Sequence, residues 1–123
     1  MKISELNTDR ACDVFCEIVP FIENITSDEE LIAELKKKMD ITEETTNAEK
    51  ISLVMSKVKV IAPVLLKKRR DDVLGIVASI NGMSVEAVKK QNFMKTMLQV
   101  RELLSDKEFL GFFKSFAGLV GGA

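Results

Sequence analysis

Helical periodicity runs through almost the whole of this sequence and constrains its fold more than any other feature. Apolar residues recur three and four positions apart in every segment, whereas the alternation typical of strands never persists. The longest stripe predicts a central helix over residues 47–68, which Pro63 should bend because proline has no N–H to donate. This stripe comprises Ile51, Val54, Met55, Val58, Ile61, Ala62 and Leu65.

Capping residues and a helix breaker mark the helices that precede this stripe. We expect the first helix to begin at Asn7 or Thr8, both good N-caps, and Pro20 to kink or break it. Ser27, followed by Glu30 three residues later, has the spacing of a capping box and should begin the second helix.

The second half of the chain follows a polar loop over residues 40–47 and predicts further short helices. Asn81 and Gly82 should end one of them, and Ser84 should begin the next. Met94 and Met97 allow two interpretations, filling of the core or an adaptable binding groove. The predicted inward face of the helix that carries them comprises Phe93, Met97, Val100 and Leu104. A second capping box, Ser105 with Glu108, should begin a terminal helix.

These elements predict an all-α fold, a compact bundle of six to seven short helices around one long central helix. The length of 123 residues fits one domain that can bury its own core. We expect a single domain over residues 1–117 and a flexible tail over residues 118–123.

The composition argues against several classes of function. The net charge is −1 at pH 7, whereas general nucleic-acid binders carry a basic excess. Histidine, the commonest general base and metal ligand, is absent, as are tyrosine and tryptophan. No apolar run approaches the ~18 residues of a membrane span, and residues 1–6 lack the apolar core of a secretion signal. We therefore expect a cytoplasmic protein that contacts neither nucleic acid nor a membrane.

Cys12 and Cys16 are the two cysteines of the chain and would lie one helical turn apart. Two thiols do not complete a zinc site, and redox pairs more often have two residues between the cysteines. Because free cysteine is among the most buried residue types, we expect both side chains in the core. We expect neither a metal nor a cofactor.

The charged clusters in this sequence fall mainly at predicted helix ends. Residues 67–70 (KKRR) should close one helix, and Asp71 with Asp72 should open the next, so that each block suits the helix dipole. Binding of phosphates or of an acidic partner by the four cations is the alternative interpretation. The paired carboxylates fall in first turns or in a loop, where nothing shelters a catalytic pair. We expect no catalytic residue and no enzymatic activity.

Four phenylalanines near the end of the chain form the strongest indication of a binding role. Phe109, Phe112, Phe113 and Phe116 are spaced so that one face of a helix carries all of them. Burial of one phenylalanine is worth about 1.5–3 kcal/mol, so this face should dock on its own domain or bind a partner. Both interpretations remain open, and they are compatible if the helix leaves the bundle when a partner arrives. These four residues are the predicted partner-binding site.

Several segments that follow one another along the chain carry a family resemblance. They are MKISEL at residues 1–6, DVFCE at 13–17, PFI at 20–22, NI at 24–25, DEEL at 28–31, IAPVL at 61–65, DVLGIVA at 72–78 and DKEFLGFFKS at 106–115. In this order they resemble the tail assembly chaperones of long-tailed phages from Gram-positive hosts.

The resemblance implies a non-enzymatic helper of virion assembly. Proteins of that family hold the long, apolar tape-measure protein before the tail tube polymerises around it, and they leave before the virion is finished. The implied partner is therefore the tape-measure protein, with the tail tube protein and self-association as further alternatives. The implied location is the host bacterial cytoplasm, and the protein should be absent from the mature virion.

A small helical DNA-binding regulator is the alternative function. Residues 74–90 have the outline of a helix-turn-helix, with Asn81 and Gly82 as the turn. The second helix of this outline is short and poor in side chains that read bases. Retention on DNA at low salt would distinguish a regulator from a chaperone.

Overall fold

The computed structural model describes residues 3–111 and 113 of the chain, and this part is all-α, as predicted. Within the described residues a 3-10 turn precedes seven α-helices, and there is no strand. The elements are η1 (Ile3–Glu5), α1 (Thr8–Thr26), α2 (Glu29–Lys38), α3 (Asn47–Ser56), α4 (Val58–Lys68), α5 (Arg70–Ile80), α6 (Val85–Lys90) and α7 (Phe93–Leu104). Residues 107–111 are also helical, whereas the predicted tail over residues 118–123 lies outside the described part.

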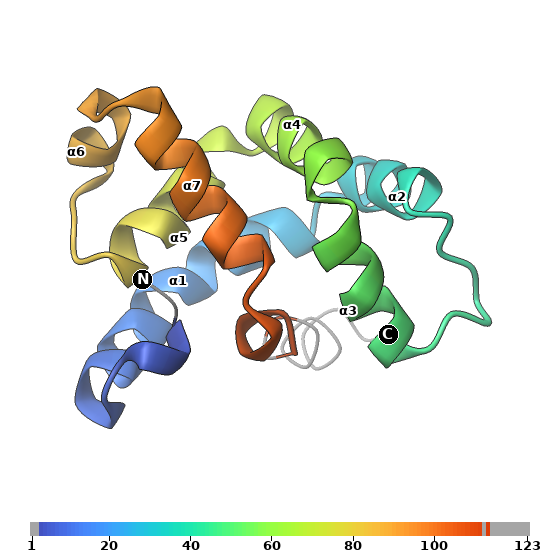
Figure 1. Ribbon diagram of the computed structural model, residues 1–123, viewed down its shortest axis with the longest axis horizontal. Coiled ribbons are helices and arrows are strands. Elements are labelled where there is room, and N and C mark those ends of the chain that lie inside the picture. Colours follow the sequence, from blue (N-terminus) through green and yellow to red (C-terminus); the bar gives the residue numbers. More distant parts are fainter. Residues whose placement is uncertain (1–2, 112, 114–123) are drawn as a thin grey trace.

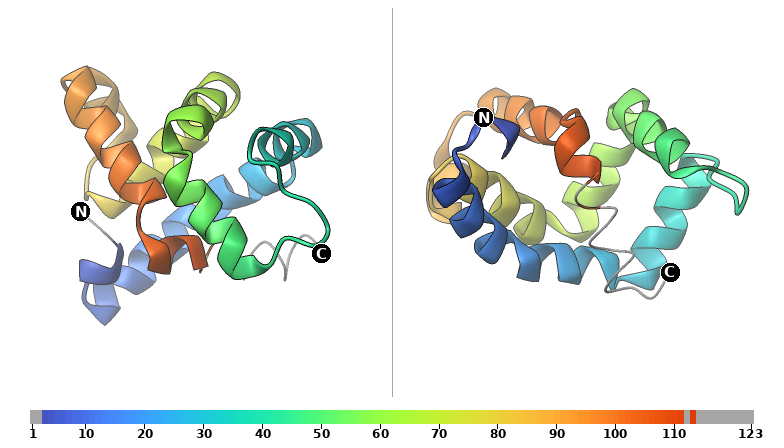
Figure 2. Two further views of the ribbon diagram at one scale, coloured as in Figure 1. Left: turned by 45° about the vertical axis from the view of Figure 1, so that its right-hand side comes forward. Right: turned by 90° about the horizontal axis from the view of Figure 1, so that it is seen from below.

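Helix α5 forms the centre of the molecule. All of its residues from Val73 to Ile80 are buried, and the helix packs against α1, α4, α6 and α7. Helix α1 runs along one side of α5 and α7 crosses the other side (Figures 1 and 2). Gly75 allows the close approach of α1, because a Cβ atom at this position would lie 2.6 Å from Cζ of Phe21.

The beginning and the end of several helices follow local signals in the sequence. Asn7 caps α1, and its side chain accepts a hydrogen bond from the N–H of Arg10 at 2.9 Å. Ser84 caps α6 in the same way, and Gly82 ends α5 with a φ of 65°. These three predictions are confirmed. Helix α2 is instead capped by Asp28, one residue after the predicted Ser27.

Of the two expected effects of Pro20, a kink or a break, the break does not occur, because α1 continues from Thr8 to Thr26. Pro20 is exposed, whereas Val14, Ile18 and Ile22 are fully buried on the opposite side of the helix. The missing backbone hydrogen bond therefore falls on the solvent side, and burial of the apolar side holds the helix together.

The predicted long helix over residues 47–68 is wrong, because the chain turns at Lys57 (φ −113°, ψ 29°) and forms α3 and α4. Pro63 lies inside α4, so it does not mark the break. Helix α4 buries Ile61, Ala62, Val64 and Leu65, whereas α3 has no fully buried residue. Val54 of α3 and Leu65 of α4 both line the same apolar pocket.

Candidate functional site

The described half of the phenylalanine stripe packs into the molecule. Phe109 is 3% exposed, Phe113 is half-buried, and their ring centroids are 6.1 Å apart. Phe112 and Phe116 lie outside the described residues. The described part of the stripe thus takes the docked arrangement, and partner contact through Phe109 would require residues 107–113 to leave the core.

Asp106 fixes the beginning of this terminal segment. Its Oδ1 accepts hydrogen bonds from the N–H groups of Glu108 at 3.1 Å and Phe109 at 3.3 Å. Its Oδ2 accepts a further bond from the N–H of Ile3 at 3.2 Å, so one buried carboxylate ties both ends of the described chain together. The predicted cap, Ser105, is one residue too early and instead ends α7.

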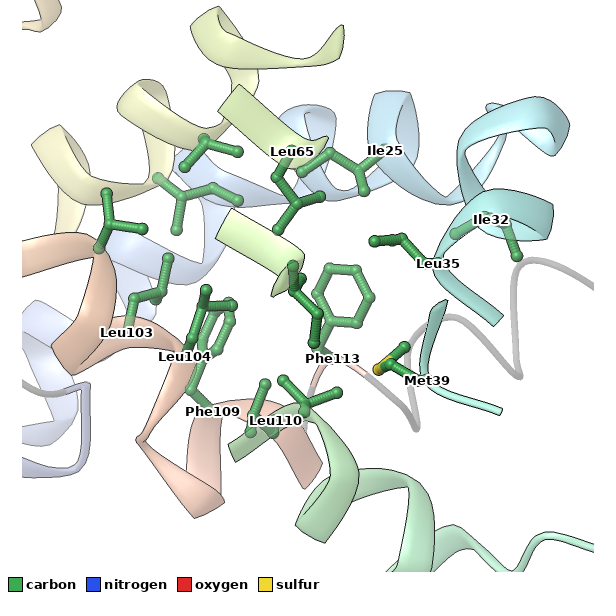
Figure 3. Close-up of a pocket in the computed structure, with 15 residues that line it drawn as sticks. Ile25, Ile32, Leu35, Met39, Leu65, Leu103, Leu104, Phe109, Leu110 and Phe113 are labelled. Atoms are coloured by element: carbon green, nitrogen blue, oxygen red, sulfur yellow. The ribbon is translucent and has the colours of Figure 1, made fainter. Parts of the chain in front are cut away.

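The terminal segment forms one wall of an apolar pocket of about 120 Å³ (Figure 3). Leu35 of α2 and Met39, which follows α2, lie on one side of it, Leu104 and Phe109 lie on the other, and Phe113 lies between them (Figure 3). All of the lining side chains are apolar, and α1, α3, α4 and α5 also contribute to the lining. A volume of this size has room for a side chain but not for a helix, so a partner helix would need to displace the segment first.

A second apolar surface lies on the first half of α7 and is open to solvent. Phe93, Met94 and Leu98 are 70%, 64% and 59% exposed, the three highest values among the large exposed apolar side chains of the described residues. The prediction that Phe93 faces the core is wrong, although Val100 and Leu104 are buried as expected. The beginning of α7 lies at the edge of the molecule next to α6 (Figure 1).

An open cleft of about 520 Å³ adjoins this surface, between α4, α5, α6 and α7. Leu74 and Val88 are buried and form its floor, whereas Phe93 and Met97 line it from α7. Met97 is half-buried and Met94 is exposed, so the adaptable groove is the better interpretation of this methionine pair. The sequence held a signal for this surface, since Met94 and Leu98 form an apolar pair four residues apart outside the buried stripe.

The basic cluster lies where α4 ends and α5 begins, and two of its members are ion-paired. Lys68 Nζ lies 2.9 Å from a carboxylate oxygen of Glu34, and Arg69 Nε lies 2.9 Å from one of Asp28. The bond from Lys68 lowers the pKa of Glu34, and that from Glu34 raises the pKa of Lys68. The N–H of Leu31 and the Arg69 guanidinium lower the pKa of Asp28. These pairs link α2 and its N-cap to the end of α4.

The helix-turn-helix outline is present as α5, the turn at Gly82 and the six-residue α6. Eight successive residues of α5 are buried, so this helix offers no face for contact with a duplex. On α6, Lys89 Nζ lies 3.0 Å from a carboxylate oxygen of Asp71.

Both cysteines are exposed, which contradicts the expected burial of Cys12 and Cys16. They lie on the solvent side of α1, one turn apart, whereas Val14 and Ile18 occupy the buried side. Among the described residues no group of three or more cysteine, aspartate or glutamate side chains could hold a metal ion. Likewise, no helix in the described ranges has both the length and the apolar character that crossing a bilayer requires.

Comparison of the chain with known protein families, with curated proteins and with solved structures finds no match.

Proposed function

We propose that this protein is a tail assembly chaperone that binds the tape-measure protein of a long-tailed phage and keeps it soluble before the tail tube polymerises. The observation that carries the proposal is the exposed apolar surface of Phe93, Met94 and Leu98 beside an open cleft. Three neighbouring apolar side chains with this exposure are typical of a surface that a partner covers. The sequence resemblance supplies the identity of the partner.

The shape of the surface favours a helical partner. A tape-measure protein is a long helical chain with apolar stripes, and an apolar stripe can lie along a groove between helices. Phe93 offers a flat ring, while Met94 and Met97 adapt to different ridges, so one surface can accept many stretches of a long partner.

Co-expression with the tape-measure protein of the same phage tests the proposal. The wild-type protein should keep that partner in the soluble fraction. The double variant Phe93→Ser and Leu98→Ser should lose most of this rescue while its melting temperature stays close to wild type, since both side chains are already exposed. Phe15→Ser on α1 is the matched control, because Phe15 is also an exposed phenylalanine but belongs to the helix on the far side of α5.

The results separate the surface from the function. Insoluble tape-measure protein in the presence of wild type would contradict the proposed function. Full rescue by the double variant would instead move the contact to another surface, with Phe113 and the rest of the terminal stripe as the next candidate. A chain that ends at Ser105 then tests the stripe, provided that its circular dichroism shows an intact fold.

A further inference from the structure

Charge is distributed very unevenly along this nearly neutral chain. Residues 1–34 carry nine acidic and two basic side chains, whereas residues 50–101 carry eleven basic and three acidic ones. The basic stretch contains α4 to α7, which together form the cleft beside Phe93. The cleft therefore lies in the basic part of the chain.

The cations at the cleft itself outnumber the acids. Arg70 and Lys89 line it, and Lys90 follows on the exposed side of α6. Asp71 is the one acid among the lining residues, and it is already paired with Lys89 at 3.0 Å. Arg70 donates from Nε to the carbonyl of Leu66 at 3.2 Å and has no carboxylate partner among the described residues.

The cleft also contains a hydrogen-bond acceptor that lacks a donor. Gln91 lines the cleft, and its Nε2 donates to Thr96 and to Gln99. Its Oε1 is buried and has no hydrogen-bond donor among the described residues. An unsatisfied buried acceptor is costly, so Gln91 is a polar group at the wall of the cleft whose hydrogen bonding is incomplete.

We infer that this cleft binds an amphipathic helix whose apolar stripe is flanked by acidic side chains. Its apolar residues would lie over Leu74 and Val88, between Phe93 and Met97. Its carboxylates would meet Arg70 and the end of α6, where charge-assisted hydrogen bonds add affinity and orient the helix. A volume of about 520 Å³ accommodates two or three side chains of such a helix, which is within the range of ordinary binding pockets. The inference rests on the proposed function in one respect, which is that the helix belongs to the tape-measure protein.

A pair of labelled synthetic peptides tests the inference directly. Both have the same apolar residues at helical spacing, and one has glutamate where the other has lysine at the flanking positions. Fluorescence anisotropy at low salt should show the acidic peptide bound at least tenfold more tightly than its basic counterpart, and added salt should reduce the difference.

Charge reversal at the cleft gives the matching protein variants. The double variant Arg70→Glu and Lys89→Glu should lower the affinity for the acidic peptide at least tenfold and should raise the affinity for the basic peptide. Lys36→Glu with Lys37→Glu makes the same charge change at exposed positions of α2 and should leave the acidic peptide bound. If the cleft variant is unstable, the ratio of the affinities of the wild-type protein for the two peptides still decides the test.

Three outcomes would overturn the inference. Equal binding of both peptides would leave an apolar contact without charge selectivity. Loss of acidic-peptide binding in the α2 control variant would show that the peptide binds outside the cleft. Binding of a random-sequence oligonucleotide that is as tight as that of the acidic peptide, and equally sensitive to the cleft variant, would indicate a general polyanion site.

The proposed function can fail separately. Binding of the acidic peptide without rescue of the tape-measure protein would support the cleft inference. It would contradict the tape-measure protein as the partner. Conversely, the wild-type protein could fail to bind the acidic peptide, and the cleft variant could still keep the tape-measure protein soluble. That result would support the proposed function and overturn the cleft inference.

Discussion

Helices α5 and α7 are similar in length and both are rich in apolar residues, yet they differ in how much of their apolar surface the fold buries. Helix α5 is buried at every position from Val73 to Ile80. Helix α7 buries Val100, Leu103 and Leu104 but leaves Phe93 and its neighbours in solvent. The difference lies in what surrounds each helix, since α5 packs closely against α1, α4, α6 and α7, whereas the closest packing of α7 is against α4 and α5.

This contrast separates the parts of the chain that hold the fold from those that are available to a partner. A charge placed between Val73 and Ile80 of α5 has no route to solvent, whereas a charge in the first half of α7 is exposed. The predictions below test this division, from the largest expected effect to the smallest.

Val77→Asp should unfold the protein, whereas Leu98→Asp should leave it folded. Val77 is 1% exposed, and burial of an unpaired carboxylate costs several kcal/mol, a large part of the ~5–15 kcal/mol that stabilise a domain. Leu98 is exposed, so its replacement should change the free energy of unfolding by less than about 0.5 kcal/mol. Circular dichroism and urea unfolding measure both effects, and a native melting curve for Val77→Asp would break the comparison.

Gly75→Ala should destabilise the protein, although alanine usually favours a helix. Overpacking against the ring of Phe21 should cost about 1–3 kcal/mol, which exceeds the ~1 kcal/mol gain in helix propensity. In a Phe21→Ala background the same change should be neutral or stabilising. Urea unfolding of the four proteins gives the coupling, and additive effects would show that the ring does not limit the space at Gly75.

Asp106→Ala should cost about 1–2 kcal/mol, because it removes the N-cap of the terminal segment and the acceptor for Ile3. Ser105→Ala, one residue earlier, should cost less than about 0.5 kcal/mol. Hydrogen exchange of the Glu108 and Phe109 amides should accelerate in the first variant alone. Equal effects of the two substitutions would restore Ser105 as the cap.

The smallest effect is expected where Asp28 pairs with Arg69 just before α5. The pKa of Asp28 lies below its ordinary value of 3.8 in the folded protein, so the unfolded chain binds more protons at acidic pH. The contribution to stability is therefore present above pH 3.8 and is lost as pH falls through the folded pKa.

Asp28→Asn should keep the N-cap, because asparagine also accepts the bond from Leu31, but it should remove this part of the acid dependence. Urea unfolding between pH 3 and pH 7 should give a shallower pH profile for the variant. Glu43→Gln, in the loop before α3, controls for the change in net charge, and an equally shallow profile there would contradict the assignment to Asp28.

Local signals predicted where most helices begin and end, because caps and turns depend on atoms within a few residues. Asn7, Ser84 and Gly82 act as their sequence positions predict. The two misplaced caps are each off by one residue, and in both cases a serine is followed by an aspartate that takes the role. Aspartate at these positions also forms longer-range bonds, Asp28 with Arg69 and Asp106 with Ile3, which no local pattern reveals.

The candidate site was harder to predict than the fold. The phenylalanine stripe indicated binding, yet its described members Phe109 and Phe113 line an internal pocket. The exposed surface on α7 instead carries a phenylalanine that had been expected to face the core. A helical stripe predicts that a helix has an apolar face, but it does not predict whether another element packs against that face.

The sequence by itself determined that this chain is helical, that its described part contains no strand, and where most of its turns lie, because these features follow from interactions within three or four residues. Only the tertiary structure decided which apolar residues are covered. The chain turns at Lys57 in the middle of a periodic stripe, and Phe93 remains in solvent because α7 begins at the edge of the molecule. Burial depends on neighbours that are distant in sequence, so periodicity alone could not assign it.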